Sequence, residues 1–168
     1  DDVGHLLMMP GQVCYEPVIQ LFGEWIVKED GSLDRETISK IVFEKKEILE
    51  KLNAIIHPAV KKYILREIER SKKEKTEFFF IEAALLIEEK YDEICDELWY
   101  IYCEKEVRME RLRHNRGYSD KKIEQMLKNQ LSDEEFESKC DFQLYNSEDV
   151  AHTYLQIERK MRTYYESM

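Results

Sequence analysis

The chain has 168 residues, of which 43% are hydrophobic, and a formal net charge of −10. This length predicts one domain with a real core, and the hydrophobic content excludes a disordered chain. The acidic balance argues against nucleic-acid binding, which needs a basic face. Because no apolar run approaches the roughly 20 residues of a membrane-spanning helix, and no secretory leader is visible, we expect no membrane association.

The four cysteines are Cys14, Cys95, Cys103 and Cys140. They show neither C-x-x-C pairing nor zinc-type spacing with the four histidines. Free thiols of this kind are typical of a reducing compartment. We therefore expect a cytoplasmic protein with reduced cysteines and no protein-bound metal site.

The first part of the chain is predicted to be mainly helical. Residues 17–22 have the pattern of a short helix that ends near Gly23. A turn follows over residues 28–35, and either Ser32 or Asp34 is expected to cap the next helix.

The long stretch over residues 38–68 carries apolar side chains at helical spacing, with Pro58 inside it. Proline lacks the N–H donor of a helix and clashes with the preceding turn. We therefore expect one helix to end near His57 and a second to begin at Pro58.

After residue 76 the pattern changes to buried strands that alternate with helices. Residues 77–87, 97–103 and 141–146 are apolar runs of strand length without strict alternation, which indicates a parallel sheet covered on both faces. Helices are expected over residues 107–127 and 150–165. The fold class is therefore α/β, with a parallel sheet flanked by helices.

An arginine cluster stands out in this acidic chain. Four of its nine arginines, Arg108, Arg111, Arg113 and Arg116, fall within nine residues. One interpretation is structural, because cations are favoured near a helix C-terminus and Gly117 is a natural helix terminator. The other is a phosphate clamp, because guanidinium groups bind phosphate oxygens bidentately. Two helices joined by an arginine-bearing hinge would then form a lid over a nucleotide.

Three further residues are candidates for a site. Glu82 falls at the carboxyl end of a predicted strand, where open α/β sheets bind ligands, although it could equally pair with a basic side chain. His57 lies between two predicted helices and could be a ligand contact, but packing or capping is the more frequent role. Asp1, at the start of the chain, has by position alone the pattern of a solvated carboxylate.

A phosphate-binding loop of the form GxxxxGK[ST] is absent from the sequence. None of the five glycines is followed by lysine. The sequence thus contains a candidate lid without a glycine-rich cradle for the nucleotide.

Five segments, in order along the chain, resemble those of one family of phosphate-loop kinases, the dephospho-coenzyme A kinases. They are DGSLDR with the following VF (residues 30–43), LNAIIHPAV (52–60), EAALLIE (82–88), RL…RGYS…Q (111–130) and CDFQLYNS (140–147). The family's Asp-Ala-Asp motif is matched by DDVGH, with Asp1 as its second aspartate. The resemblance implies that the first strand, the phosphate loop and the first helix precede residue 1 in the parent protein.

The resemblance implies a single kinase domain over residues 1–168 with the three-layer, nucleoside-monophosphate-kinase-like architecture of P-loop NTPases. Within it, residues 6–72 would form the helical acceptor-binding region. Residues 76–103 and 141–168 would form the core, and residues 104–140 the lid region. The sequence departs from the family at three places: Glu82 where aspartate is common, Ala84 in place of proline, and Phe136 in place of a basic residue, for which Lys139 is the nearest substitute.

The implied reaction is transfer of the γ-phosphoryl group of ATP to the ribose 3′-hydroxyl of dephospho-coenzyme A. The family likeness assigns Asp1 to orient or deprotonate that hydroxyl, and Arg111 and Arg116 to neutralise charge on the transferring group. ATP and Mg²⁺ are the implied cofactors.

The binding residues follow from the same likeness. His57 and Glu82 would contact the acceptor substrate, and Arg113 and Asn146 would contact ATP. The implied partners are the two small-molecule substrates, with no nucleic acid and no membrane, and the protein would be a monomer or a weak homo-oligomer.

Two alternatives stay open. One is another small-molecule or nucleotide kinase of the same fold, although the His-Pro segment and the DGSLDR turn argue against it. The other is a non-catalytic fragment that keeps the acceptor site, and the absent phosphate loop supports it. The chain by itself is expected to be inactive.

Overall fold

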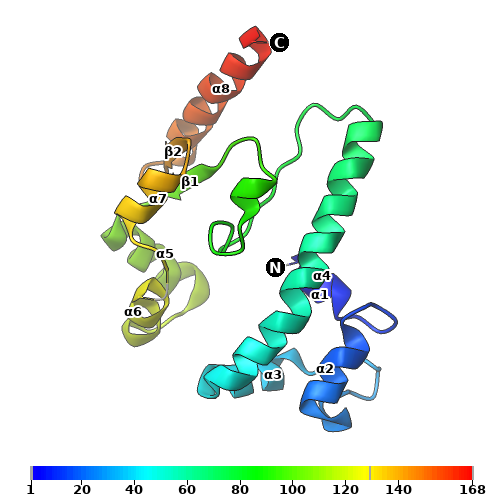
Figure 1. Ribbon diagram of the computed structural model, residues 1–168. Coiled ribbons are helices and arrows are strands. Elements are labelled where there is room, and N and C mark those ends of the chain that lie inside the picture. Colours follow the sequence, from blue (N-terminus) through cyan, green and yellow to red (C-terminus); the bar gives the residue numbers. More distant parts are fainter. Residues whose placement is uncertain (1, 129, 168) are drawn as a thin grey trace. The chain divides into compact units, whose positions relative to one another are not determined.

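The computed structural model describes residues 2–128 and 130–167 and contains two compact units, unit 1 (Asp1–Ala84) and unit 2 (Leu85–Met168). Unit 1 is helical (Figure 1). Its elements are α1 (Asp2–Leu7), α2 (Tyr15–Phe22), the 3₁₀ helix η1 (Glu24–Ile26), α3 (Arg35–Glu44) and α4 (Lys46–Lys73).

The core of unit 1 is apolar and is contributed by every one of its elements. The long helix α4 packs against α1, α2 and α3. Burying these side chains is the main stabilising contribution to such a small helical unit. The buried residues are Leu7, Cys14, Val18, Ile26, Leu33, Ile38 and Leu52.

Two predictions for the first 35 residues are confirmed, the helix end near Gly23 and the helix start capped by one of the two candidates. Helix α2 ends at Phe22, and Gly23 follows with a φ of 98°, which favours glycine. Asp34, rather than Ser32, caps α3. Its carboxylate accepts hydrogen bonds from the backbone nitrogen of Thr37 at 3.2 Å and from the Thr37 hydroxyl at 2.6 Å.

The predicted helix boundary at His57 and Pro58 is wrong. Helix α4 runs without a break from Lys46 to Lys73, and Pro58 lies inside it. The real boundary is at Lys45, whose φ of −124° and ψ of 92° are extended. The continuous helix keeps one apolar face against the core on both sides of the proline, and this packing outweighs the single backbone bond that proline removes. The residues of that face are Leu52, Ile55, Ile56, Ala59, Val60 and Tyr63.

The strand predicted over residues 77–87 is also wrong. Residues 77–83 pair with no strand in the described part of the chain, and residues 84–90 are turns. The side chain of Phe80 is 71% exposed. An apolar run of strand composition becomes a strand only when a neighbouring backbone satisfies its N–H and C=O groups.

Unit 2 contains the sheet and the remaining helices. The predicted strands at 97–103 and 141–146 are confirmed as a parallel pair. The helical stretch predicted over 107–127 is divided into two helices at Gly117, as the predicted hinge requires, and the structure adds a short helix, α7. The elements are η2 (Tyr91–Glu93), β1 (Trp99–Tyr102), α5 (Lys105–Arg116), α6 (Asp120–Lys128), α7 (Asp133–Lys139), β2 (Phe142–Tyr145) and α8 (Val150–Ser167).

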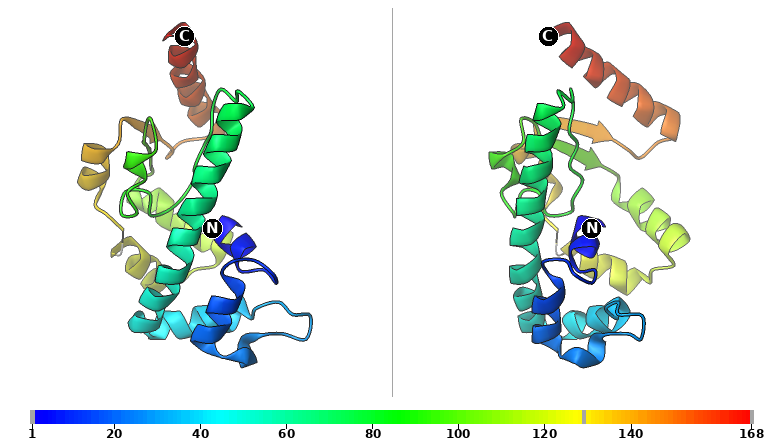
Figure 2. Two further views of the ribbon diagram at one scale, coloured as in Figure 1. Left: turned by 45° about the vertical axis from the view of Figure 1, so that its right-hand side comes forward. Right: turned by 90° about the vertical axis from the view of Figure 1, so that its right-hand side faces the viewer.

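The two strands lie side by side (Figure 2), with Trp99 opposite Phe142 and Tyr102 opposite Tyr145. On one face Trp99 meets Phe142 edge to face at 4.9 Å between ring centroids. On the other face Tyr102 stacks on Tyr145 at 5.6 Å. These cross-strand aromatic contacts fix the register of a sheet that has only two strands.

Helix α8 is held at the amino end of β1 by Glu97. One oxygen of this carboxylate, Oε1, accepts from Lys160 Nζ at 2.8 Å and from Trp99 Nε1 at 2.9 Å. The other, Oε2, accepts from the Tyr164 hydroxyl at 2.6 Å. Lys160 and Tyr164 both belong to α8, so one carboxylate ties the last helix to the sheet.

Candidate functional site at the carboxyl end of the parallel strands

The carboxyl ends of β1 and β2 are tied together by polar contacts. The backbone N–H of Asn146 donates to the carbonyl of Tyr102 at 2.8 Å, and the N–H of Glu104 donates to the Ser147 hydroxyl at 2.8 Å. The Tyr145 hydroxyl donates to the Glu104 carboxylate, which raises the pKa of Tyr145 above its usual value. This is the edge at which open α/β sheets bind their ligands.

Two of the predicted site residues, Arg111 and Asn146, meet at this edge. Arg111 Nη1 donates to the carbonyl oxygen of Asn146 at 2.5 Å, and Nη2 donates to the carbonyl of Glu148 at 3.0 Å. Arg111 Nη1 also lies 3.7 Å from the sulfur of Cys103. The guanidinium thus fixes the loop after β2, 35 residues further along the chain.

The side chain of Asn146 is oriented by a second contact. Its Oδ1 accepts from the Thr153 hydroxyl at 3.1 Å, and Thr153 belongs to α8. The amide nitrogen remains available to donate to a ligand, because none of the interactions of residues 2–128 and 130–167 engages it. An amide with its oxygen fixed in this way can offer N–H donors to the edge of a base.

Arg113 and Arg116 lie at the other end of α5. Arg113 Nε donates to Asp120 at 2.5 Å, which joins the end of α5 to the start of α6. Gly117 lies between them with a φ of 63°, and its N–H donates to the Arg113 carbonyl at 3.0 Å. Arg116 is exposed and makes no hydrogen bond or ion pair within the described residues. The sequence therefore predicted the hinge, but not that Arg113 is already paired.

The other predicted site residues belong to unit 1. His57 is half-buried on α4, and Glu82 is exposed. Asp1 lies outside the described residues. A Cβ at Gly4 would lie 3.6 Å from Cγ2 of Ile56, so α1 passes the residue next to His57.

Sequence reasoning missed one polar pair in unit 1. Arg35 Nη2 donates to Nε2 of His5 at 2.5 Å. Partial burial, and after it the charge of Arg35, lower the pKa of His5, so the imidazole is neutral at pH 7. The signal was present, because His5 and Arg35 belong to the DDVGH and DGSLDR segments that carry the family resemblance. The pair leaves an exposed cationic group on unit 1.

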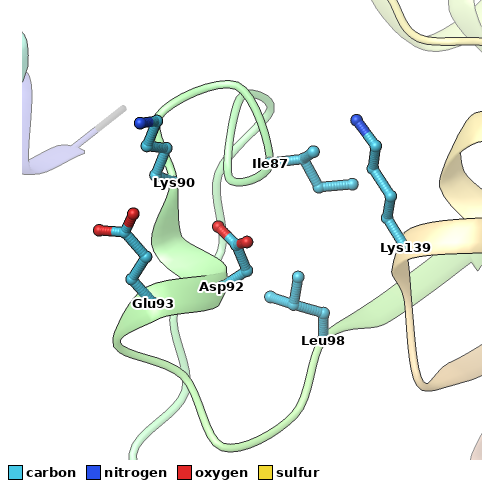
Figure 3. A pocket seen from close by; sticks show the side chains of 6 residues that line it. All are labelled: Ile87, Lys90, Asp92, Glu93, Leu98 and Lys139. Carbon is cyan, nitrogen blue, oxygen red and sulfur yellow. The ribbon is translucent and has the colours of Figure 1, made fainter.

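A pocket of about 370 Å³ lies elsewhere in unit 2, beside the residue that precedes β1 and the last residue of α7 (Figure 3). Two lysines and two acidic residues face it around an aliphatic floor, so the lining is charged but balanced in sign. The lining residues are Ile87, Lys90, Asp92, Glu93, Leu98 and Lys139. None of them is a predicted site residue, and the pocket is at the amino end of the strands.

The described residues contain no group of three or more His, Cys, Asp or Glu side chains placed to hold a metal ion. Over the same residues, no helix has the length and hydropathy to cross a membrane. The cysteines Cys14, Cys95, Cys103 and Cys140 are free thiols.

Two solved structures share this architecture. A crystal structure of TT1252 from Thermus thermophilus has a TM-score of 0.76 at 22% identity and covers 97% of this chain and 81% of its own. A dephospho-CoA kinase from Campylobacter jejuni has a TM-score of 0.69 at 24% identity, with 96% and 81% covered. At these identities the likeness concerns the fold, which is that of an α/β phosphate-loop kinase.

The sequence comparisons are more specific. The family described as "Dephospho-CoA kinase" matches residues 1–152. A dephospho-CoA kinase from Symbiobacterium thermophilum is 32% identical over 162 residues, which are 96% of this chain and 68% of that protein. One from Aquifex aeolicus is 35% identical over 161 residues, with 95% and 80% covered. The yeast enzyme from Saccharomyces cerevisiae is 32% identical, with 94% and 67% covered.

The chain belongs to the dephospho-CoA kinase family. Its members are kinases that carry out the last step of coenzyme A synthesis, so the resemblance in the five sequence segments is confirmed. Neither alternative, a different kinase of the same fold or a non-catalytic binding module, is favoured by these relatives.

Proposed function

We propose that the protein transfers the γ-phosphoryl group of ATP to the ribose 3′-hydroxyl of dephospho-coenzyme A. The observation that carries this proposal is the convergence of Arg111 and Asn146 at the carboxyl end of β1 and β2. A cation and an amide at this edge suit the phosphates and the base of a nucleotide.

In the proposed step, the 3′-oxygen attacks the γ-phosphorus, and the bond from the γ-phosphorus to the bridging oxygen of ADP breaks. The hydroxyl proton passes to the carboxylate of Asp1 as the new bond forms. Such transfer depends on positioning and charge neutralisation more than on covalent chemistry. His57, within the helical region of residues 6–72, and Glu82, within the core segment of residues 76–103, contact the acceptor substrate.

The contacts of the three arginines support different roles for them. Arg111 donates two hydrogen bonds to carbonyl groups of the loop after β2. Because these bonds hold the guanidinium in place, it neutralises phosphate charge from a fixed position. Arg113 contacts ATP only if it leaves Asp120. Arg116, which is exposed and has no partner among the described residues, is the arginine free to close over the transferring group.

Mg²⁺ is the proposed metal, and it comes with ATP rather than with a protein-built cage. The exposed carboxylate of Glu82 is an oxygen donor of the kind that Mg²⁺ accepts. When bound, the ion neutralises charge on the β- and γ-phosphates.

We infer three regions in one kinase domain: residues 6–72 bind the acceptor, residues 76–103 together with 141–168 form the core, and residues 104–140 form the lid region. The free thiols support a cytoplasmic location. The net charge of −10 supports small-molecule partners rather than nucleic acid. The protein is proposed to be a monomer or a weak homo-oligomer, which light scattering after size-exclusion chromatography would measure.

The test is a direct assay of ATP-dependent 3′-phosphorylation of dephospho-coenzyme A, resolved by chromatography. It is run on this chain and on any longer product that the gene encodes. A panel of nucleosides and nucleoside monophosphates serves as the competing acceptors. Selective turnover of dephospho-coenzyme A supports the proposal, whereas turnover of another acceptor alone, or of none in the longest product, contradicts it.

The sharpest single variant in that assay is Arg116→Ala. We expect kcat to fall by about 100-fold, because a cation on the transferring group is lost. Arg159→Ala removes an exposed arginine from α8 and is the matched control, with unchanged kcat. Equal kcat values for the two variants would remove Arg116 from the proposed mechanism.

A further inference from the structure

Asp133 connects three elements of unit 2. The Tyr100 hydroxyl, on β1, donates to Asp133 Oδ1 at 2.5 Å. Arg108 Nη2, on α5, lies 3.6 Å from the same oxygen and donates to the carbonyl of Cys103 at 3.1 Å. Asp133 itself is the first residue of α7. A single carboxylate oxygen thus joins β1, α5 and α7.

The surroundings hold this carboxylate in a defined place. Tyr100 is only 8% exposed, and its ring stacks on Phe136 of α7 at 4.8 Å and an interplanar angle of 12°. Ser132 and Glu135 form a reciprocal capping box at the start of α7, with bonds of 3.2 and 2.9 Å. Phe136, one of the three departures from the family pattern, therefore has a structural role as the stacking partner of Tyr100.

Arg108 is poorly explained by stability alone. Its Nε is buried and has no acceptor among the residues that the structure describes. A buried donor without a partner costs free energy, and replacing a partly buried ion pair by apolar side chains is often neutral or stabilising. The presence of the Arg108 guanidinium at this position is therefore better explained by a functional role than by a contribution to the stability of the fold.

The sequence positions of the residues that make these contacts indicate the functional role. Arg108 lies near the start of the lid region, residues 104–140, and Asp133 lies near its end. Between them the chain carries Arg111 and Arg116. The end of the segment at Asp133 is thus bonded to β1 through Tyr100, and the end at Arg108 is bonded to the carbonyl of Cys103, the residue after β1, and lies against the same Asp133 oxygen.

We propose that Tyr100, Arg108 and Asp133 are positioning residues that fasten the base of the lid region to β1 and thereby set where its arginines close over ATP. This inference rests on the proposed kinase function. None of the three residues touches the reacting atoms. A loosened base lets the arginines close imperfectly, so water reaches the γ-phosphate and ATP is hydrolysed without transfer.

The variants are made in the longest product that the gene encodes. They are Tyr100→Phe, which removes one oxygen, and Asp133→Asn, which keeps an acceptor but removes the charge. Tyr154→Phe and Glu134→Gln are the matched controls, because both side chains are exposed and Glu134 directly follows Asp133 on α7. The measured quantity is the rate of ADP formation without dephospho-coenzyme A, divided by the rate of transfer with it.

We expect that ratio to rise about fivefold in each test variant, to stay unchanged in the controls, and to rise by less than the product of the two single effects in the double variant. A purely structural role would lower both rates together and leave the ratio constant. A constant ratio in Tyr100→Phe, the variant with the smallest risk of misfolding, would overturn the inference.

Hydrogen exchange, followed by mass spectrometry without any substrate, separates this inference from the proposed function. Peptides from α6 should exchange about fivefold faster in the test variants than in the controls, while peptides from α8 stay unchanged. Unchanged exchange in α6 would overturn the inference even if the kinase reaction is observed. Faster exchange in a protein without turnover of dephospho-coenzyme A would support the fastening but overturn the proposed function.

Discussion

The two units are held together by different chemistry. Unit 1 has an apolar core to which every helix contributes, and the ion pairs described for it join neighbouring residues along one helix. In unit 2, three carboxylates hold β1 in place: Glu97 to α8, Asp133 to α7, and Asp141, which accepts from the N–H of Leu98 at 2.8 Å. The comparison teaches that packing volume fixes the helical unit, while directional polar contacts fix the sheet with its few strands.

The difference has a physical origin in the number of strands. A pair of strands has little apolar surface to bury and leaves much of its backbone near water. Ile101 on β1 is 49% exposed. Directional bonds from Glu97 and Asp133 therefore supply the specificity that a larger sheet would obtain from burial. In unit 1, by contrast, acidic residues such as Asp34 and Glu36 cap a helix or pair with a basic residue along the same helix.

The largest expected effect is on the packing of unit 1. Ile26 is 0% exposed, so Ile26→Ala should lower the free energy of unfolding by about 3 kcal/mol. The cost comes from lost apolar burial and from the cavity left in the core. Hydrogen exchange of unit 1 peptides measures it, and Val13→Ala, at a side chain that is 65% exposed, is the control. Similar losses in both variants would mean that unit 1 is not fixed by packing.

The next effect tests the polar contacts of unit 2. Glu97→Gln keeps the shape of the side chain but leaves Lys160, which is 22% exposed, without its counter-ion. We expect a loss of about 1–2 kcal/mol, measured by exchange of α8 peptides. Glu158→Gln removes an exposed pair with Arg162 on the same helix and should cost less than about 0.5 kcal/mol. If the two losses are equal, Glu97 does not hold α8.

The pH dependence of unit 2 follows from the same group. Burial by itself would raise the pKa of Glu97, but the hydrogen bonds from Lys160 and Tyr164 outweigh it and leave the pKa below its usual value. The stability it contributes is therefore complete above the unfolded pKa of about 4.3 and is lost as pH falls through the lower folded value. Denaturation of the wild type should become easier below about pH 4, and less so for Glu97→Gln.

The smallest effect concerns the start of α3. Asp34→Ala should cost about 1 kcal/mol, because the bonds from Thr37 to the cap are lost. Asp34→Asn keeps an acceptor and should cost less. Urea denaturation followed by circular dichroism measures both. If Asp34→Ala lowered the free energy of unfolding as much as Ile26→Ala does, the conclusion that packing fixes unit 1 would be contradicted.

The sequence was sufficient to predict secondary structure where local sequence rules and tertiary packing favour the same structure. The glycines that end α2 and α5 could be predicted directly, and the cap of α3 could be narrowed to Ser32 or Asp34, because each feature needs only its immediate neighbours. The strands β1 and β2 could also be recognised from composition. Helix α7 was missed, although Ser132 and Glu135 form the S-x-x-E pattern of a capping box.

The predictions were wrong where the local structure depends on a residue that is distant in sequence. Pro58 is a local signal for a break, but the apolar face of α4 on both sides of it is a tertiary feature. Residues 77–83 have strand composition, yet a strand also needs a neighbour. In the candidate site, residue types could be predicted, but not their pairing. No local rule indicates that Arg113 binds Asp120 or that Arg111 meets the carbonyl of Asn146.

The parallel pairing of β1 and β2 also has a consequence for how the protein folds. Leu98 and Asp141, which are bonded at the start of the two strands, are 43 residues apart in sequence. Closing a loop of that length costs about 3 kcal/mol of chain entropy before any bond of the sheet is gained. The helices of the loop need no such closure, because their bonds join residues four apart. Folding of unit 2 is therefore limited by the meeting of its strands, so α5, α6 and α7 have time to form first.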